Sequence, residues 1–407
     1  MNINTDIART YIVSNKKLTA VAAFGVLLGM SIYIFMNCML VSFDRIGNDS
    51  IFKATSHIRV YNDDVISQNL VHNDKDIYLI SNPKVVPKTN TIIDPKSVEA
   101  LILAQKEVTI VTPQVNASVF YNNGKSQIAG LSVGIKPDEA NRMYNIQSSL
   151  VDGDMELLKT NPNGIFIGSG IAEKMNLTLN DNLSLTSQKG ITKSLKVIGI
   201  FKTNNAQTDK TKSYINIGTA QQLLGEGSSY ITDISVNITD PEAAEAVGAK
   251  LTALTGYKAE GWKQANETVV AASRMRKIVI TIVSFTLLLV AGFGIYNILN
   301  MTVSQKINDI AILKAMGFKG KDVIRIFVTQ ALTIGVMGVL GGMTMATVLI
   351  TILKKVYVGG DIGYFPVNYE PQKFLQGAVI GLIITFFAGY IPAKKAAKVD
   401  PVTIFRK

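Results

Sequence analysis

Cysteine and histidine are nearly missing from this chain of 407 residues. The one cysteine, Cys38, excludes a disulfide framework within the chain, so cysteine usage does not report the redox compartment. His57 and His72 are the two histidines, too few to build a His/Cys metal centre or a Cys–His nucleophile pair. We therefore expect no catalytic residue, no metal site and no cofactor-binding residue in this chain.

Charged residues are missing from four long apolar segments. Hydrophobic residues make up 47% of the chain and charged residues 17%, and the mean hydropathy of +0.25 is above that of an ordinary soluble enzyme. A helix of about 20 residues spans the roughly 30 Å hydrocarbon core of a bilayer, and the first segment is too long for a signal peptide. We expect four transmembrane helices, at 18–43, 278–305, 326–353 and 374–393.

Lys and Arg residues concentrate beside the ends of these spans on one side of the membrane. The tail 1–17, the loop 306–325 and the tail 394–407 carry thirteen of them, whereas the loop 354–373 and the edge of the soluble block 44–277 carry six. Because short loops rich in Lys and Arg stay in the cytoplasm, we expect both termini there and the block outside. The net charge of +11 then reflects the membrane flanks, and no nucleic-acid partner is expected.

Asp, Glu, Lys, Arg and His are absent from all four predicted spans. A pore or a proton-coupled carrier usually needs such groups at membrane depth, so both are disfavoured. Glycines at helix-packing spacing predict close contacts between spans, although glycine is also common in spans without any specific role. The three pairs are Gly25 with Gly29, Gly338 with Gly342, and Gly377 with Gly381.

Strand and helix signals alternate through the block 44–277. Two strand–helix–strand units, 44–129 and 226–277, flank a middle segment, 130–225, that is richer in strands and turns. The sharpest local predictions are a strand at Val108–Val111, a hairpin of Val115–Tyr121 and Gln127–Ile135 around a turn at Gly124, and a helix Pro241–Leu254 with Asp240 as its N-cap.

The loop 306–325 predicts a short amphipathic helix. Apolar residues between Ile307 and Ala315 recur at helical spacing, and Gly317 is placed to end the helix. Lys306, Asp309 and Lys314 are expected on the polar side. Such a helix lies on the membrane surface or docks in a groove of a cytoplasmic partner. The candidate contact residues are Gln305, Lys306, Asp309, Ile310, Ala311, Ile312, Leu313, Lys314, Ala315, Met316 and Gly317.

Two motifs resemble a known family. The stretch DIAILKAMG at 309–317 looks like the coupling-helix signature of the FtsX/MacB superfamily of ABC permeases, and 391–402 is similar to the closing motif of that superfamily. The order of one span, an outer domain and three spans also matches, most closely the lipoprotein-releasing LolC/LolE type. This resemblance implies an α+β membrane protein whose outer α/β domain has a porter-like part, 44–129 and 226–277, and a sabre-like part, 130–225.

The resemblance also implies a permease subunit of the mechanotransmission type in the bacterial inner membrane. Two permeases, identical or different, would work with separate ATPase subunits that bind ATP, because this sequence has no Walker motif. ATP hydrolysis would move the outer domain to extract or export lipoproteins or other envelope substrates, with a periplasmic carrier or adaptor as a further partner. Two alternatives stay open: a MacB-like tripartite efflux permease, and an FtsX-like regulator of cell-wall hydrolases.

Two departures from the family pattern bear on the expected partners. Gln305 stands where the superfamily commonly has Glu, which removes one potential ionic contact with the ATPase. The expected strands Leu183–Thr186 and Leu195–Ile198 are joined by only Ser187–Ser194, whereas LolC has a long hook there that grips a periplasmic lipoprotein carrier. Docking of a carrier through this hairpin is therefore disfavoured.

Overall fold

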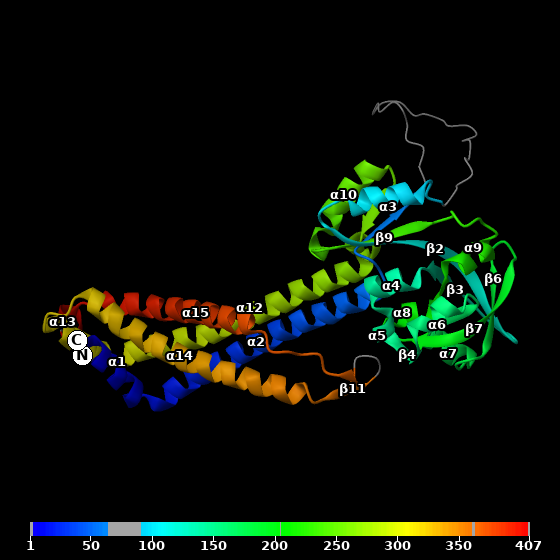
Figure 1. Cartoon of the computed structure of the whole chain (residues 1–407). Helices are drawn as coiled ribbons and strands as arrows, with labels where there is room; N and C mark the ends of the chain where they lie inside the picture. Colours follow the sequence, from blue (N-terminus) through cyan, green and yellow to red (C-terminus); the bar gives the residue numbers. More distant parts are fainter. Residues whose placement is uncertain (1–2, 64–90, 204, 360–362, 406–407) are drawn as a thin grey trace, which may run out of the picture. The chain divides into compact units, whose positions relative to one another are not determined.

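The computed structural model describes residues 3–63, 91–203, 205–359 and 363–405. The chain divides into two compact units, whose elements are labelled in Figure 1. Met1–Ile46 and Ala271–Lys407 form the helical unit, and Gly47–Val270 forms the α/β unit. Arg406 and Lys407, two of the basic residues expected near the spans, lie outside the described residues.

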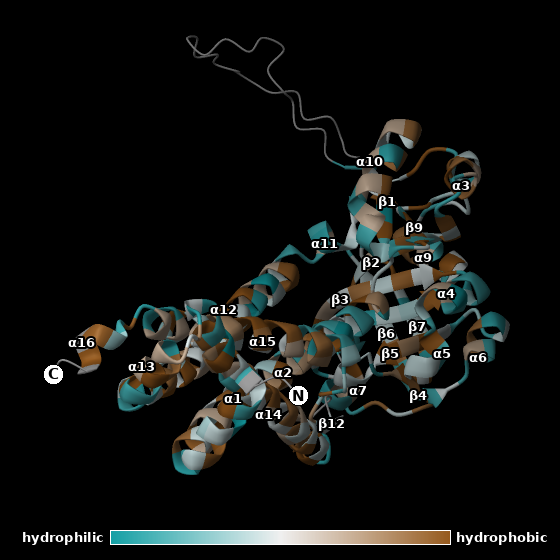
Figure 2. Cartoon of the chain, turned by 90° about the vertical axis from the view of Figure 1, so that its left-hand side faces the viewer, coloured by the Kyte–Doolittle hydropathy of each residue, from teal (hydrophilic) through white to brown (hydrophobic). Residues whose placement is uncertain are grey.

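Four helices in the described part of the chain are long and apolar enough to cross a membrane. Each contains one of the expected spans, so the prediction of one span before the α/β unit and three after it is confirmed. Hydrophobic residues run along these helices (Figure 2). They are α2 (Lys16–Phe52), α12 (Glu267–Gln305), α14 (Gly320–Leu353) and α15 (Pro371–Ala397). The helical unit also contains α1 (Ile3–Ser14), α13 (Ile307–Ala315), α16 (Pro401–Phe405) and the strands β11 (Tyr357–Gly359) and β12 (Gly363–Tyr364).

Glycines let α14 pack directly against α2. A Cβ atom added to Gly338 would lie 2.5 Å from Val26 Cβ, and one added to Gly342 would lie 2.6 Å from Met30 Cβ. Both distances are far below a carbon–carbon contact, so only glycine permits this approach of the two helices. Close packing is likewise confirmed at Gly29, Gly377 and Gly381. At Gly25 an added Cβ would have no atom within 4 Å, so the contact expected there is wrong.

The α/β unit is built on one path of strands, in the order β10-β1-β9-β2-β3-β8-β5-β7-β4, with β6 paired to both β2 and β7. The hairpin of β2 and β3 and the turn at Gly124, whose φ is +58°, are confirmed. The strands are β1 (Ile58–Tyr61), β2 (Val108–Asn123), β3 (Ser126–Ile135), β4 (Leu150–Gly153), β5 (Gly164–Gly168), β6 (Asn182–Ser187), β7 (Thr192–Phe201), β8 (Lys212–Asn216), β9 (Asp233–Ile238) and β10 (Lys258–Gly261).

Short helices cover the strands of the α/β unit. The expected N-cap is confirmed, because the Asp240 carboxylate accepts a hydrogen bond of 3.0 Å from the Glu242 N–H. The helices are α3 (Pro95–Leu103), α4 (Pro137–Tyr144), α5 (Ile146–Ser149), α6 (Met155–Thr160), α7 (Ser169–Met175), α8 (Ala206–Thr211), α9 (Ile217–Leu224), the 3₁₀ helix η1 (Pro241–Ala243), α10 (Ala244–Thr255) and α11 (Trp262–Ala265).

Strand β2 is a single strand where two were predicted from the sequence. Val108–Val111 and Val115–Tyr121 were expected as separate strands, but they form one strand that pairs first with β9 and then with β3. Pro113 lies in this strand opposite Ile234, near the point where the partners change, and a proline is tolerated where its nitrogen is not needed as a donor. The division at residue 130 falls inside β3, and the porter-like and sabre-like parts stay a prediction.

The hairpin of β6 and β7 is shorter than expected. The register pairs Thr186 with Thr192, so only residues 188–191 lie between the two strands. The expected connection of Ser187–Ser194 is therefore partly strand. This leaves even less chain for a projecting hook at this position.

Replacing Gly338 with alanine should weaken the packing of α14 on α2. The new Cβ would overlap Val26, and overpacking of this kind typically costs about 1–3 kcal/mol, so we expect a lower melting temperature of the detergent-solubilised full chain. Gly25→Ala is the matched control, because the site is open and alanine favours helix more than glycine does. Equal melting temperatures for the two variants would contradict this account of the packing.

Candidate functional site

Helix α13 follows α12 with almost no break. Lys306 is the one residue between them, and its N–H donates to the Thr302 carbonyl (3.0 Å) while its own carbonyl accepts from the Ile310 N–H (2.9 Å). At the other end the Phe318 N–H donates to Leu313 and the Gly317 N–H to Lys314. With φ of +103° at Gly317, this is a Schellman motif. The predicted helix and its end at Gly317 are confirmed.

One face of α13 is buried against its own chain. Ile310 and Ala311 are 1% and 0% exposed, and Ile310 belongs to a cluster formed by α1, α13, α14 and the ends of α12 and α15. Burial of this face anchors α13 to the helical unit. The other members of the cluster are Ala8, Tyr11, Val303, Val323, Ile326, Phe327, Ala393 and Ala396.

The opposite face of α13 is apolar as well. Ile312 is 47% exposed and Met316 is 66% exposed, and positions four apart lie above one another on a helix. Ala315, expected on the buried side, is exposed. The expectation of one apolar and one polar face is therefore wrong, because the apolar residues of α13 surround the helix and only part of them contact the rest of the chain.

The charged residues of α13 are engaged within the chain. Lys314 Nζ donates to the backbone carbonyls of Ala397 (3.1 Å) and Val399 (2.6 Å), where the carbonyls at the end of α15 lack helical partners. Lys306 Nζ lies 2.9 Å from the Asp309 carboxylate. Of the predicted contact residues, Gln305, Ile312, Ala315, Met316 and Gly317 are exposed, Lys306, Asp309, Leu313 and Lys314 are half-buried, and Ile310 and Ala311 are buried.

Helix α1 is a part of this site that the sequence reasoning missed. Residues 1–17 were expected as a tail, but α1 packs on α14, where the Tyr11 and Phe327 rings are 6.0 Å apart. Burial, and next the Asp309 charge, raise the pKa of Tyr11. Apolar residues at Ile7, Ala8, Tyr11 and Ile12 were the available signal. A cavity of about 510 Å³ lies between α1 and α13, lined by Asp6, Ile7, Thr10, Tyr11, Asp309, Ile312 and Leu313.

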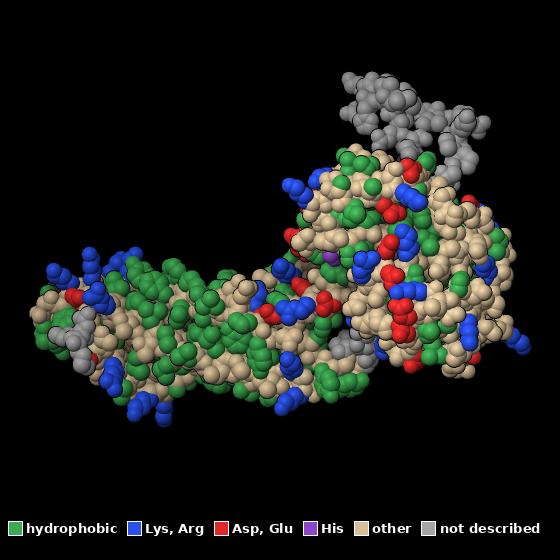
Figure 3. All heavy atoms as spheres, in the orientation of Figure 1, with side chains coloured by type: hydrophobic (Ala, Val, Ile, Leu, Met, Phe, Trp, Pro, Cys, Tyr) green, Lys and Arg blue, Asp and Glu red, His purple; other side chains and the backbone are tan. Residues whose placement is uncertain are grey.

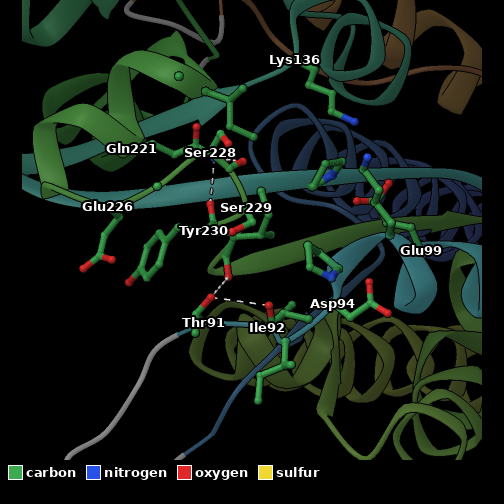
Figure 4. A pocket seen from close by; sticks show the side chains of 18 of the residues that line it. Thr91, Ile92, Asp94, Glu99, Lys136, Gln221, Glu226, Ser228, Ser229 and Tyr230 are labelled. Carbon is green, nitrogen blue, oxygen red and sulfur yellow. Dashed lines mark hydrogen bonds between the residues drawn. The ribbon is translucent and has the colours of Figure 1, made fainter.

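A second cavity, of about 780 Å³, lies in the α/β unit. Figure 4 shows Gln221, Ser228 and Tyr230 on one side of it and Glu99 and Lys136 on the other. The Gln221 amide donates to the carbonyls of Ser228 (2.9 Å) and Tyr230 (3.0 Å), which fixes the loop between α9 and β9. The lining is of mixed polarity, which suits a binding surface better than a catalytic centre.

Glu99 is the half-buried carboxyl group of this second cavity. Burial raises its pKa above the usual value, Lys136 opposes this effect, and Glu139 adds to it. A raised pKa means that the charged form is disfavoured in the folded protein. Glu99 is therefore a group whose ionisation opposes folding at neutral pH.

The fold and the sites together define a multi-pass membrane protein of the ABC permease class. Two family models match the chain: "MacB-like periplasmic core domain" over residues 19–254 and "FtsX-like permease C-terminal" over residues 281–401. The chain belongs to this family of FtsX-like permeases with a MacB-like periplasmic core domain.

Individual relatives include proteins named LolC and proteins named MacB. The lipoprotein-releasing system transmembrane protein LolC of Xylella fastidiosa is 23% identical over 75% of this chain and 80% of its own length. The macrolide export ATP-binding/permease protein MacB of Psychrobacter cryohalolentis is 26% identical over 51% of this chain and 32% of its own length. A crystal structure of the periplasmic region of MacB from Actinobacillus actinomycetemcomitans matches 53% of this chain and 93% of that chain, at 16% identity and a TM-score of 0.33.

Replacing Lys314 with methionine should loosen the end of α15 from α13. The variant loses a charged donor to two carbonyls, and hydrogen bonds to charged groups contribute about 1.5–3 kcal/mol. We expect a lower melting temperature of the full chain in detergent. Lys321→Met, at an exposed position of α14, is the control, and an equal loss in both variants would point to a general charge effect instead.

Replacing Glu99 with glutamine should stabilise the chain at neutral pH. As pH rises through its raised pKa, the wild-type carboxyl group ionises in an unfavourable environment, and glutamine removes that cost. The melting temperature should therefore be higher for Glu99→Gln at pH 7.5, with the difference shrinking below pH ~4, where both side chains are neutral. Glu173→Gln, at an exposed position, should change nothing; a pH-independent difference for Glu99→Gln would contradict the prediction.

Proposed function

We propose that this chain is a permease subunit of the mechanotransmission type, which couples ATP hydrolysis by a separate ATPase to movement of its α/β unit. The exposed apolar face of α13 carries the proposal. Ile312 and Met316 are large apolar side chains left uncovered by the rest of the chain, and helices with such a face dock into grooves of partner proteins. The partner is the ATPase, and the contact residues are the exposed ones of the predicted stretch, namely Gln305, Ile312, Ala315, Met316 and Gly317.

Helix α12 supplies the connection to the α/β unit. Its 39 residues make a helix of about 58 Å, much longer than the roughly 30 Å that a bilayer core requires. Glu267–Val270 of this helix belong to the α/β unit and the remainder to the helical unit. A displacement of α13 is therefore passed along an unbroken helix into the α/β unit.

The distribution of charge supports a cytoplasmic position for α13. In Figure 3, Lys and Arg side chains gather at the end of the helical unit where Figure 1 places α13 and both termini. Basic segments beside spans are retained in the cytoplasm. We accordingly place both termini and the ATPase on that side and the α/β unit on the outer side of the inner membrane.

The substrates proposed are lipoproteins or other envelope molecules that are handled outside the membrane. The predicted spans lack Asp, Glu, Lys, Arg and His, and the glycine contacts bring the backbones of the helices together, which leaves little room for a polar path between them. The chain would act as one of two paired permeases, identical or different. Because the hairpin of β6 and β7 is short, a periplasmic carrier or adaptor would contact another part of the α/β unit.

The test of this function is a charge placed on the exposed face of α13. Ile312→Asp should reduce, at least about tenfold, the amount of a Walker-motif protein that co-purifies with the full chain from native membranes, because a carboxylate would be buried unpaired in the interface. Mass spectrometry identifies the protein, and ATP hydrolysis by the complex is measured in parallel. Leu254→Asp, which adds the same charge at an exposed apolar position of α10 in the α/β unit, is the control. Unchanged co-purification in Ile312→Asp would refute the function.

A further inference from the structure

We propose that α1 and α13 together form the surface on which the ATPase docks, and that the groove between them receives an apolar side chain of the ATPase flanked by a Lys or Arg. The inference rests on the proposed function and extends it to an element outside the family signature. It assigns a role to the cavity of about 510 Å³ between the two helices, a size typical of a binding pocket.

The walls of this groove are held in place. Tyr11 is 7% exposed, and its ring lies 6.0 Å from Phe327 on α14 and 5.6 Å from the Lys306 ammonium. Asn4 donates to the Asp322 carboxylate (3.5 Å) and fixes the start of α1. A preorganised groove loses little freedom when a side chain enters it.

The groove is continuous with the exposed face of α13. Ile312 lines the groove and, with Met316, also forms the uncovered stripe. A partner that covers this stripe therefore also reaches the groove, and the remaining apolar lining comes from Ile7, Tyr11 and Leu313.

Charge identifies the kind of occupant. Asp6 and Asp309 lie at the groove. Because Asp309 is paired with Lys306 at 2.9 Å, the exposed Asp6 carboxylate is the charge offered to a partner, whereas the surrounding end of the helical unit is rich in Lys and Arg (Figure 3). Those basic residues attract anionic lipid headgroups, and carboxylates repel them, so a lipid is a poor occupant. A protein side chain of positive charge beside an apolar one is complementary to the groove.

Cross-linking tests the contact directly. A photoreactive benzoyl-phenylalanine at Thr10, which lines the groove, should attach the full chain in native membranes to the same Walker-motif protein that co-purifies with it. The same group at Thr5, exposed on α1 but outside the groove lining, should not. A cross-link from Thr10 only to lipid, only to a second copy of this chain, or to nothing overturns the proposal.

Charge reversal tests the recognition. Asp6→Lys should lower association with the ATPase about fivefold or more and leave the melting temperature unchanged, because Asp6 is exposed. Thr5→Lys, an exposed neighbour on α1, should have little effect. If Ile312→Asp abolishes association with the ATPase while Asp6→Lys leaves it unchanged, the groove proposal is refuted and the proposed function stands. If neither variant changes association with the ATPase, the proposed function itself is refuted.

Discussion

The junction at Lys306 is the constraint on which the rest of the molecule depends. Because one residue joins α12 to α13 and its backbone bonds to both helices, α13 has no loop that would absorb a displacement. Lys314 adds a second attachment through the carbonyls of Ala397 and Val399. Helix α13 is therefore tied to both α12 and α15, and these helices form one packed assembly rather than separate helices.

A second set of attachments joins the end of α2 to the elements of the α/β unit. Phe52, the last residue of α2, packs edge-on against Trp262 with ring centroids 5.1 Å apart, and the Trp262 indole donates to the Pro241 carbonyl (2.8 Å). Lys212 on β8 donates to the Ala54 carbonyl (2.8 Å) just beyond α2, and burial lowers the pKa of this lysine. These contacts fix the last turn of α2 within the α/β unit, to which residues from Gly47 onward belong.

Sequence reasoning succeeded where one local rule dominates. The bilayer requires long uncharged helices, a glycine such as Gly338 is needed where backbones touch, and Gly317 adopts a conformation that ends α13. It failed where distant segments decide the outcome. Helix α1 exists by packing on α14, and β2 continues through Pro113 because β9 and β3 pair with its two halves. The apolar spacing of residues 7–12 indicates that α1 is a helix but not where it packs, and the pairing of β2 with two different strands has no signal within a short window of sequence.

The faces of α13 show why a motif alone does not locate a binding surface. In the stretch Asp309–Gly317 the charged residues have partners within the chain, while the exposed residues are apolar. Lys314 positions the helix, whereas Ile312 and Met316 stay exposed. The proposed transfer of force needs both features, since an unanchored helix would move without the rest of the unit and an anchored helix without an exposed face would offer a partner no contact.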